Sequence, residues 1–181
     1  ETDAANPRAV NEFGHIIRWR EADNDHTATT FSWDIFVFAG DETHSRDLAG
    51  DALTEHSIFS SPDGLWFDRD GRLWIRTDIS DRVQNKDNHK IFGNNQMLAA
   101  DPVSGEIRRF LTGPIGEEIT GAVKTPDGKT MFVNVQHPGA TTTAKDFAAG
   151  KLNSHWPDGG EAYPRSATVV ITKEDGGVIG T

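Results

Sequence analysis

Residues 64–75 read GLWFDRDGRLWI, and this segment is the clearest indication of the fold class. In it, an Asp-Gly pair separates two short runs of aromatic and aliphatic residues. Such a pair between apolar runs is among the strongest local signals of a β-hairpin, because Gly accepts the positive φ that a tight turn needs. The stretch therefore predicts two antiparallel strands joined by a turn at residues 69–71.

The same arrangement recurs along the chain. A second hairpin is expected from strands at residues 97–101 and 107–111, joined by the turn sequence PVSG. Residues 121–135, with PDG at their turn, then match the first hairpin, and residues 168–179, with a returning strand at 178–179, match the second. A four-stranded unit that recurs after roughly 60–70 residues is typical of consecutive β-propeller blades.

Two more strands are expected near the N-terminus, at residues 14–19 and 31–38, because both are rich in aromatic and β-branched residues. No amphipathic helix longer than about two turns is expected. The fold class is therefore all-β. The tryptophans within the strand patterns are expected to fill the core; they are Trp19, Trp33, Trp66 and Trp74.

Blade boundaries follow from these strands. We expect residues 1–43 to hold strands of an incomplete blade, residues 61–113 to form one blade and residues 117–181 another. The polar segment 44–60 is expected to be a loop, with one helical turn at 48–54, and segment 78–93 an exposed excursion. Propellers typically close with about 4–8 blades. We therefore expect two to three blades of a longer protein, whose remaining blades, or a homo-oligomer, cover the exposed strand edges.

Composition and charge exclude several classes of function. A formal net charge of −10 argues against nucleic-acid binding, which needs a basic surface. No apolar run approaches the roughly 18 residues that span a bilayer. The chain has no cysteine, which excludes thiolate metal ligands and cysteine nucleophiles within it. It begins without the basic and apolar regions of an export signal, so we expect that such a signal has been removed or that the chain is a fragment.

Several ordered segments carry a resemblance to a known family. They are NEFGHIIRWRE at residues 11–21, FSWDIF at 31–36, SPDG through LWIRTD at 61–78, EITG at 118–121, NVQHPG at 134–139 and PRSA at 164–167. A single Pro-Asp-Gly is ordinary turn chemistry. The Gln-His-Pro-Gly block and the order of the segments together resemble the C-terminal portion of PhoX-type, calcium-dependent alkaline phosphatases.

This resemblance implies a six-bladed propeller with metal ions in its central channel, and an exported, periplasmic or secreted phosphomonoesterase that uses calcium together with iron. Hard oxygen ligands suit Ca²⁺, and cations would neutralise phosphate oxygens. The family's iron-ligating cysteine has no counterpart here, and Arg18 stands where characterised members can carry a glutamate. We therefore expect the chain to be inactive alone.

The resemblance also implies site residues. Glu118, before Thr-Gly, matches a metal-binding glutamate, with the adjacent Glu117 as the alternative, because neighbouring strand residues face opposite sides. Blade symmetry would aim Asp63 at the same channel, unless it only serves its turn. His137 would ligate metal or contact phosphate, or be structural. Arg165 would grip phosphate with its guanidinium fork, or form a structural salt bridge.

Two other functions fit parts of the sequence. Residues 62–74 also resemble calcium-dependent lactonases of the gluconolactonase type, although the Gln-His-Pro-Gly block favours the phosphatases. A non-catalytic propeller that binds a partner through its surface is the second alternative. It predicts no tightly bound metal and no loss of fold with a chelator.

Overall fold

The computed structural model describes residues 1–181 and contains three antiparallel sheets. The first pairs β1 (His15–Glu21) with β2 (Phe31–Phe38). The second has the order β3 (Pro62–Phe67), β4 (Leu73–Thr77), β5 (Gln96–Ala100) and β6 (Ile107–Thr112). The third contains β7 (Glu118–Lys124), β8 (Thr130–Gln136) and β9 (Ala167–Thr172). The all-β prediction is confirmed.

Helical structure is confined to connections. It comprises α1 (Ala144–Ala148) and the short 3₁₀ turns η1 (Ala22–Asn24) and η2 (Asp87–His89). No helix has the length and apolar character that a membrane crossing requires. Residues 48–54 contain no helical turn, contrary to expectation.

The first predicted hairpin forms as the sequence indicates. Trp66 pairs with Trp74 and Phe67 with Leu73 across β3 and β4. In the turn between them, Gly71 has a φ of +81°, and the Asp68 carboxylate accepts hydrogen bonds from the Asp70 and Arg72 amides. The glycine of the Asp-Gly pair therefore supplies the positive φ, and Asp68, two residues before that pair, satisfies the turn backbone.

The third sheet has one strand fewer than expected, because residues 178–179 do not pair with β9. The Ile179 amide donates instead to the Gly128 carbonyl in the β7–β8 turn, and the Ile179 side chain is fully buried. This side chain joins the core between the second and third sheets, where Trp74 and Met131 are also buried. The segment therefore closes the core without widening the sheet.

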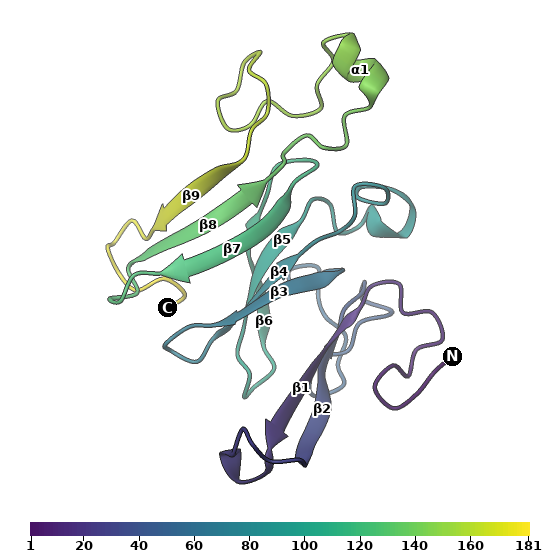
Figure 1. Cartoon of the computed structure of the whole chain (residues 1–181), viewed down its shortest axis with the longest axis vertical. Helices are drawn as coiled ribbons and strands as arrows, with labels where there is room; N and C mark the ends of the chain where they lie inside the picture. The colour runs from purple at the N-terminus through teal and green to yellow at the C-terminus, as the bar shows by residue number, and fades with distance from the viewer.

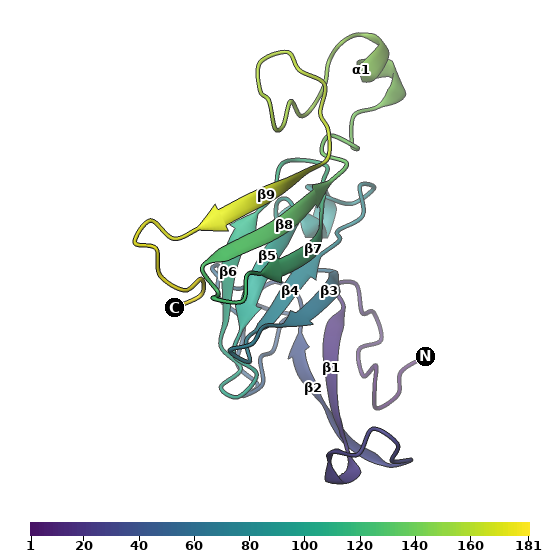
Figure 2. The same cartoon turned by 60° about the vertical axis from the view of Figure 1, so that its left-hand side comes forward.

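Each face of the middle sheet packs against a neighbouring sheet, and the three sheets follow one another along the molecule (Figures 1 and 2). Alternation along β4 sends Leu73 and Ile75 into a core shared with Phe36 of β2, and Trp74 into a second core shared with Ile119 of β7. This arrangement is compatible with consecutive blades. The propeller and its boundaries at 1–43, 61–113 and 117–181 stay predictions.

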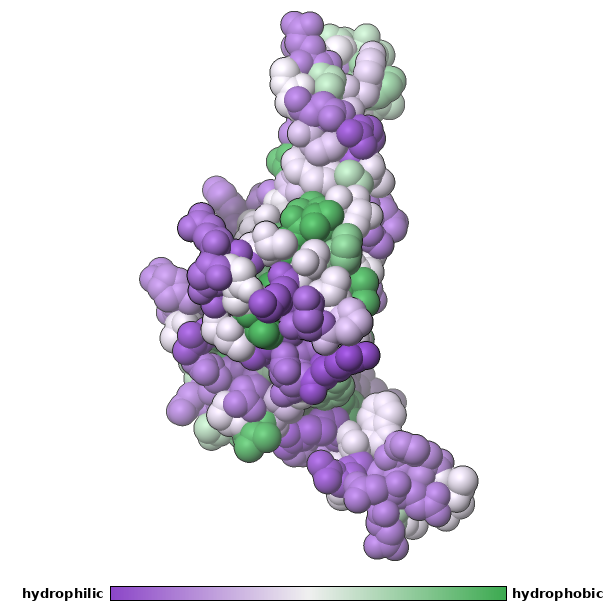
Figure 3. Space-filling view, turned by 90° about the vertical axis from the view of Figure 1, so that its left-hand side faces the viewer, coloured by the Kyte–Doolittle hydropathy of each residue, from purple (hydrophilic) through white to green (hydrophobic).

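Burial differs from expectation at two places. The segment 78–93 is not an exposed excursion, because Ile79, Gln84 and Phe92 are buried within it. Trp19 and Trp33 are not core residues, since they are 62% and 41% exposed on the far part of the β1–β2 hairpin, which extends beyond the middle sheet (Figure 1). The side of the molecule seen in Figure 3 is mostly hydrophilic, with apolar residues in small separate groups.

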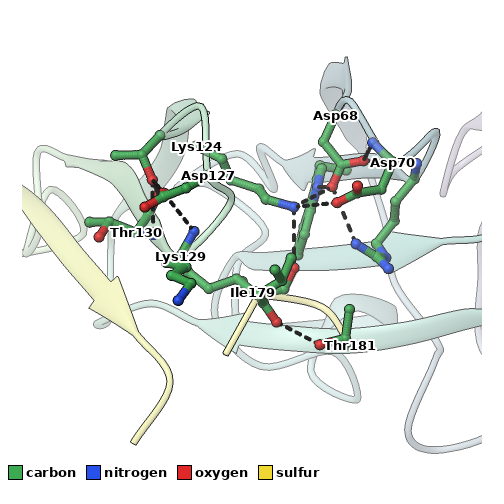
Figure 4. A network of polar contacts seen from close by, with 12 residues as sticks. Asp68, Asp70, Lys124, Asp127, Lys129, Thr130, Ile179 and Thr181 are labelled. Atoms are coloured by element: carbon green, nitrogen blue, oxygen red, sulfur yellow. Dashed lines mark hydrogen bonds and ion pairs between the residues drawn. The ribbon is translucent and has the colours of Figure 1, made fainter. Parts of the chain in front are cut away.

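A buried ion pair joins the second and third sheets. The Lys124 side chain at the end of β7 is 5% exposed, and its Nζ lies 2.9 Å from an Asp68 carboxylate oxygen and 3.1 Å from one of Asp70 (Figure 4). Lys124 also donates to the Ile179 carbonyl at 3.2 Å. One ammonium thus ties β7, the β3–β4 turn and the C-terminal segment together.

Several protein groups donate hydrogen bonds to the buried Asp68 carboxylate. Burial alone would raise its pKa, but hydrogen bonds from Lys124, from the Trp74 indole at 2.9 Å and from the Arg72 amide outweigh burial and lower it. A carboxyl whose pKa is depressed by folding stabilises the native state above its unfolded pKa, and this contribution is lost as pH falls through the folded value.

We expect Lys124→Ala to destabilise the protein by about 3 kcal/mol at pH 7, because it removes the closest ion-pair partner of the buried Asp68 carboxylate and leaves only Arg72, at 3.2 Å. Urea denaturation measures this change. Lys129→Ala, a nearby exposed lysine, is the control and should change stability by less than about 0.5 kcal/mol. The stability difference between Lys124→Ala and the unmodified protein should shrink as acid protonates Asp68. Equal stabilities at pH 7 would contradict a stabilising role of the Lys124–Asp68 ion pair.

Candidate functional site

Acidic side chains gather where the start of β7 meets the ends of β4 and β8. The pairing of Glu118 with Gln136 and of Pro62 with Thr77 brings these strand ends to one edge of the two sheets. They surround a hollow of about 390 Å³, lined by Asp78, Ile79, Ser80, Asp81, Gln84, Gly116, Glu117, Glu118, His137 and Ala140.

Glu117 is the most unusual residue of this hollow. It is 1% exposed, and neither carboxylate oxygen has a hydrogen-bond partner. A Cβ at position 113 would overlap the carboxylate, so Gly113 provides the space that it occupies. Burial, with the nearby charges of Glu118 and Asp78, raises the pKa of Glu117 to about 8.

Buried amides hold the Glu117 backbone in place. The Asn95 side chain donates to the Glu117 carbonyl at 2.7 Å and accepts from the Thr77 hydroxyl and the Ile79 amide. Gln84 donates to the same carbonyl at 3.4 Å and accepts from the Gly116 amide at 2.8 Å. The backbone is therefore fixed on both sides of the glutamate while the carboxylate is left free.

Glu118 and Asp78 complete the acidic group. Burial and the charge of Asp78 raise the pKa of Glu118, and burial and the charge of Asp63 raise that of Asp78; in both cases His137 opposes the rise. Gln136 donates to the Glu118 carboxylate at 3.4 Å. Carboxyl groups that raise one another's pKa in this way form an environment that favours a bound cation.

His137 lies across the hollow from these acids in a strained backbone conformation. Its φ is +38°, which is uncommon for a residue other than Gly, and its amide donates to the Ser166 hydroxyl at 2.9 Å. Its Nε2 lies 3.5 Å from a Glu118 carboxylate oxygen and its Nδ1 3.3 Å from the Gly116 carbonyl oxygen. Strain of this kind is often concentrated at functional sites.

Of the five site residues predicted from the sequence, the structure places three at the hollow and two outside it. Glu117, Glu118 and His137 line the hollow. Asp63 is exposed at the start of β3 and acts electrostatically on Asp78 and Glu118. Arg165 does not line the hollow; its guanidinium makes two hydrogen bonds of 2.9 Å to the exposed Asp158.

Sequence reasoning overlooked Asp78 as a site residue, together with the supporting amides of Gln84 and Asn95. A signal for Asp78 is present, because it directly follows the predicted strand segment LWIRT and so is expected at the end of a strand. Gln84 and Asn95 carry no comparable signal. Only the folding back of segment 78–95 over the strand ends brings them to Glu117.

The donor set suits a hard cation such as Ca²⁺, which prefers carboxylate and carbonyl oxygens. The two buried, unpartnered oxygens of Glu117 are the observation that supports this fit. No three His, Asp or Glu side chains of the chain lie close enough together to hold a metal ion by themselves. The hollow therefore offers part of a coordination shell.

Comparisons with known proteins agree on one family. The family model described as Alkaline phosphatase PhoX matches residues 1–139. The solved structure of Pseudomonas fluorescens PhoX in complex with vanadate, a transition state analogue, is 43% identical with a TM-score of 0.83. The alignment covers 99% of this chain and 30% of that chain. A search of curated protein sequences gave no significant match.

We expect Glu117→Gln to raise the melting temperature at pH 9, without divalent cations, by about 5 °C, which corresponds to roughly 2 kcal/mol for a domain of this size. A carboxyl whose pKa is raised by folding destabilises the native state increasingly as pH rises from its unfolded value to its folded value of about 8. The advantage of Glu117→Gln should therefore vanish near pH 5.

Differential scanning fluorimetry across pH 5–9 measures this difference. Glu106→Gln, which alters an exposed carboxylate paired with Arg108, is the control and should show no such pH dependence. A difference between Glu117→Gln and the unmodified protein that stays constant with pH would contradict a buried carboxyl that titrates near pH 8.

Proposed function

Because the chain belongs to the alkaline phosphatase PhoX family, we propose that it is part of a metal-dependent phosphomonoester hydrolase and supplies residues to its metal and substrate site. The observation that carries the proposal is the buried carboxylate of Glu117, which has no partner in the chain and stands beside Glu118 and Asp78. A cation is the partner that would compensate all three.

Glu117 and Glu118 are the proposed Ca²⁺ ligands, and Asp63 a third carboxylate near the same ion. Both glutamates, rather than one of the two, are proposed as ligands because both line the hollow. Bound calcium would neutralise the charge of phosphate oxygens. Iron, if the whole protein uses it, takes its ligands mainly from elsewhere, because this chain has no cysteine.

His137 is proposed to contact the substrate. Its Nε2 faces Glu118 at 3.5 Å, and the side chain is partly open to solvent. An imidazole in this position can donate a hydrogen bond to a phosphate oxygen or pass a proton to a leaving alkoxide. Arg165 is a weaker candidate for the phosphate contact, because Asp158 already occupies one edge of its guanidinium.

The chain spans about 30% of the length of the solved PhoX chain that it matches. The remaining ligands and blades are therefore proposed to come from the rest of the protein. Exposed apolar side chains on the outer face of the third sheet support this proposal; they are Val123, Phe132 and Val170. Export to the periplasm or the cell exterior is proposed from family membership.

The test is metal content and hydrolysis measured on the same sample. The purified chain is soaked with Ca²⁺, free metal is removed, and bound metal is quantified by elemental analysis. We expect bound calcium, at least tenfold less of it in Glu117→Gln, and no hydrolysis of p-nitrophenyl phosphate by the chain alone. The same substitution in the full-length protein should abolish hydrolysis.

A sugar lactone serves as the control substrate, because a lactonase-type propeller would hydrolyse it. Hydrolysis of the lactone by the full-length protein, and not of the phosphate ester, would refute the phosphatase proposal. Absence of bound calcium in both the chain and the full-length protein would refute the assignment of Glu117 and Glu118 as ligands.

A further inference from the structure

Arg76 is a buried guanidinium without a partner. The residue is 8% exposed, and its Nε and Nη1 atoms are inaccessible to solvent and make no hydrogen bond. Its only resolved electrostatic partner is Asp63, whose influence acts without a direct ion pair. Leaving a buried charged group unpaired costs stability, so such a group calls for an explanation.

The position of Arg76 relates it to the hollow. It lies opposite Met97 in the ladder between β4 and β5, on the face of the middle sheet that packs toward β7. Side chains two apart on a strand point to the same face. Arg76 therefore shares its face of β4 with Trp74, and Asp78 follows just past the end of the strand, at the edge of the hollow.

The neighbouring strand leaves room for this side chain. A Cβ at position 64 would lie 2.5 Å from the Nε and Nη2 atoms of Arg76, which is closer than real Cβ contacts allow. The guanidinium therefore rests directly on the backbone of Gly64 in β3. Gly64 holds the guanidinium beside the strand edge that carries Asp63.

Other partly buried or ion-paired arginines are already engaged. Arg18 bonds to Asp34, Arg72 to Asp68, and Arg109 to Gln96 and to two backbone carbonyls. Arg165 bonds to Asp158. Arg76 is thus the buried arginine of the chain, and its Nε and Nη1 donors have no partner.

We propose that Arg76 is a phosphate-binding residue that contacts an oxyanion of the substrate next to the acidic hollow. This inference rests on the proposed function. A planar guanidinium with free donors matches phosphate geometry. Cations bound by the carboxylates and the guanidinium of Arg76 would then act on the same phosphate from two sides.

The test is calorimetric titration of inorganic phosphate into the unmodified protein and Arg76→Gln, both with and without Ca²⁺. We expect at least tenfold weaker phosphate binding by Arg76→Gln, because hydrogen bonds to charged groups are lost. Gly64→Ala should weaken binding similarly by displacing the guanidinium. Arg108→Gln, an exposed arginine on β6, should bind phosphate normally.

Thermal stability without phosphate separates a binding role from a structural one. If Arg76 is kept for binding, Arg76→Gln should melt at the same temperature as the unmodified protein or higher. A loss of several degrees would overturn the proposal, as would phosphate binding equal to that of the unmodified protein, or no phosphate binding by the unmodified protein. Calcium binding, measured separately through Glu117→Gln, reports on the proposed function alone.

Titration with acetate tests whether the site prefers phosphate to another small oxyanion. If acetate at equal concentration binds as well as phosphate and is lost in Arg76→Gln, the guanidinium binds small oxyanions without preference, and the phosphate assignment falls. A preference of at least tenfold for phosphate over acetate supports it.

Discussion

The pairing of Lys124 with Asp68 sets the relative position of the second and third sheets. A lysine at the end of β7 reaches the β3–β4 turn and the Ile179 carbonyl, so three segments distant in sequence share one ammonium. Buried ion pairs contribute modestly to net stability, but they specify one arrangement, since every shift of the sheets would leave a charge unpaired. The acidic hollow lies at the opposite ends of β3 and β7 from this ion pair. The geometry of the hollow depends on the relative position of the two sheets.

Buried charged side chains have partners at one end of the contact between the second and third sheets and lack them at the other. At the Lys124–Asp68 ion pair, every buried charge has a partner, and the pKa of Asp68 is lowered despite its burial. At the hollow, Glu117 and Arg76 are buried without partners, and the pKa of Glu117 is raised to about 8. Proteins commonly give up stability at functional sites and compensate for it elsewhere. This contrast within one pair of sheets is the physical argument that the hollow binds ligands.

Family membership and geometry support different parts of the interpretation. Similarity to PhoX covers nearly the whole chain and suggests the class of reaction. The geometry distinguishes the individual residues. It brings Glu117, Glu118 and His137 together. It also shows that Arg165 is bonded to Asp158, whereas Arg76 has donors without a partner. The chain corresponds to about a third of the solved PhoX chain, in keeping with a hollow that offers only part of a metal coordination shell.

The sequence alone predicts most of the strands and the tight turns, because Asp-Gly signals and apolar alternation act over a few residues. It also identified the family through ordered segments such as Gln-His-Pro-Gly. It did not reveal that Ile179 plugs a core, that segment 78–93 is partly buried or that Trp19 is exposed. Those features, and the meeting of Asp78, Glu117 and His137, were decided by the tertiary structure, since burial and charge coupling depend on contacts between residues that lie far apart along the chain.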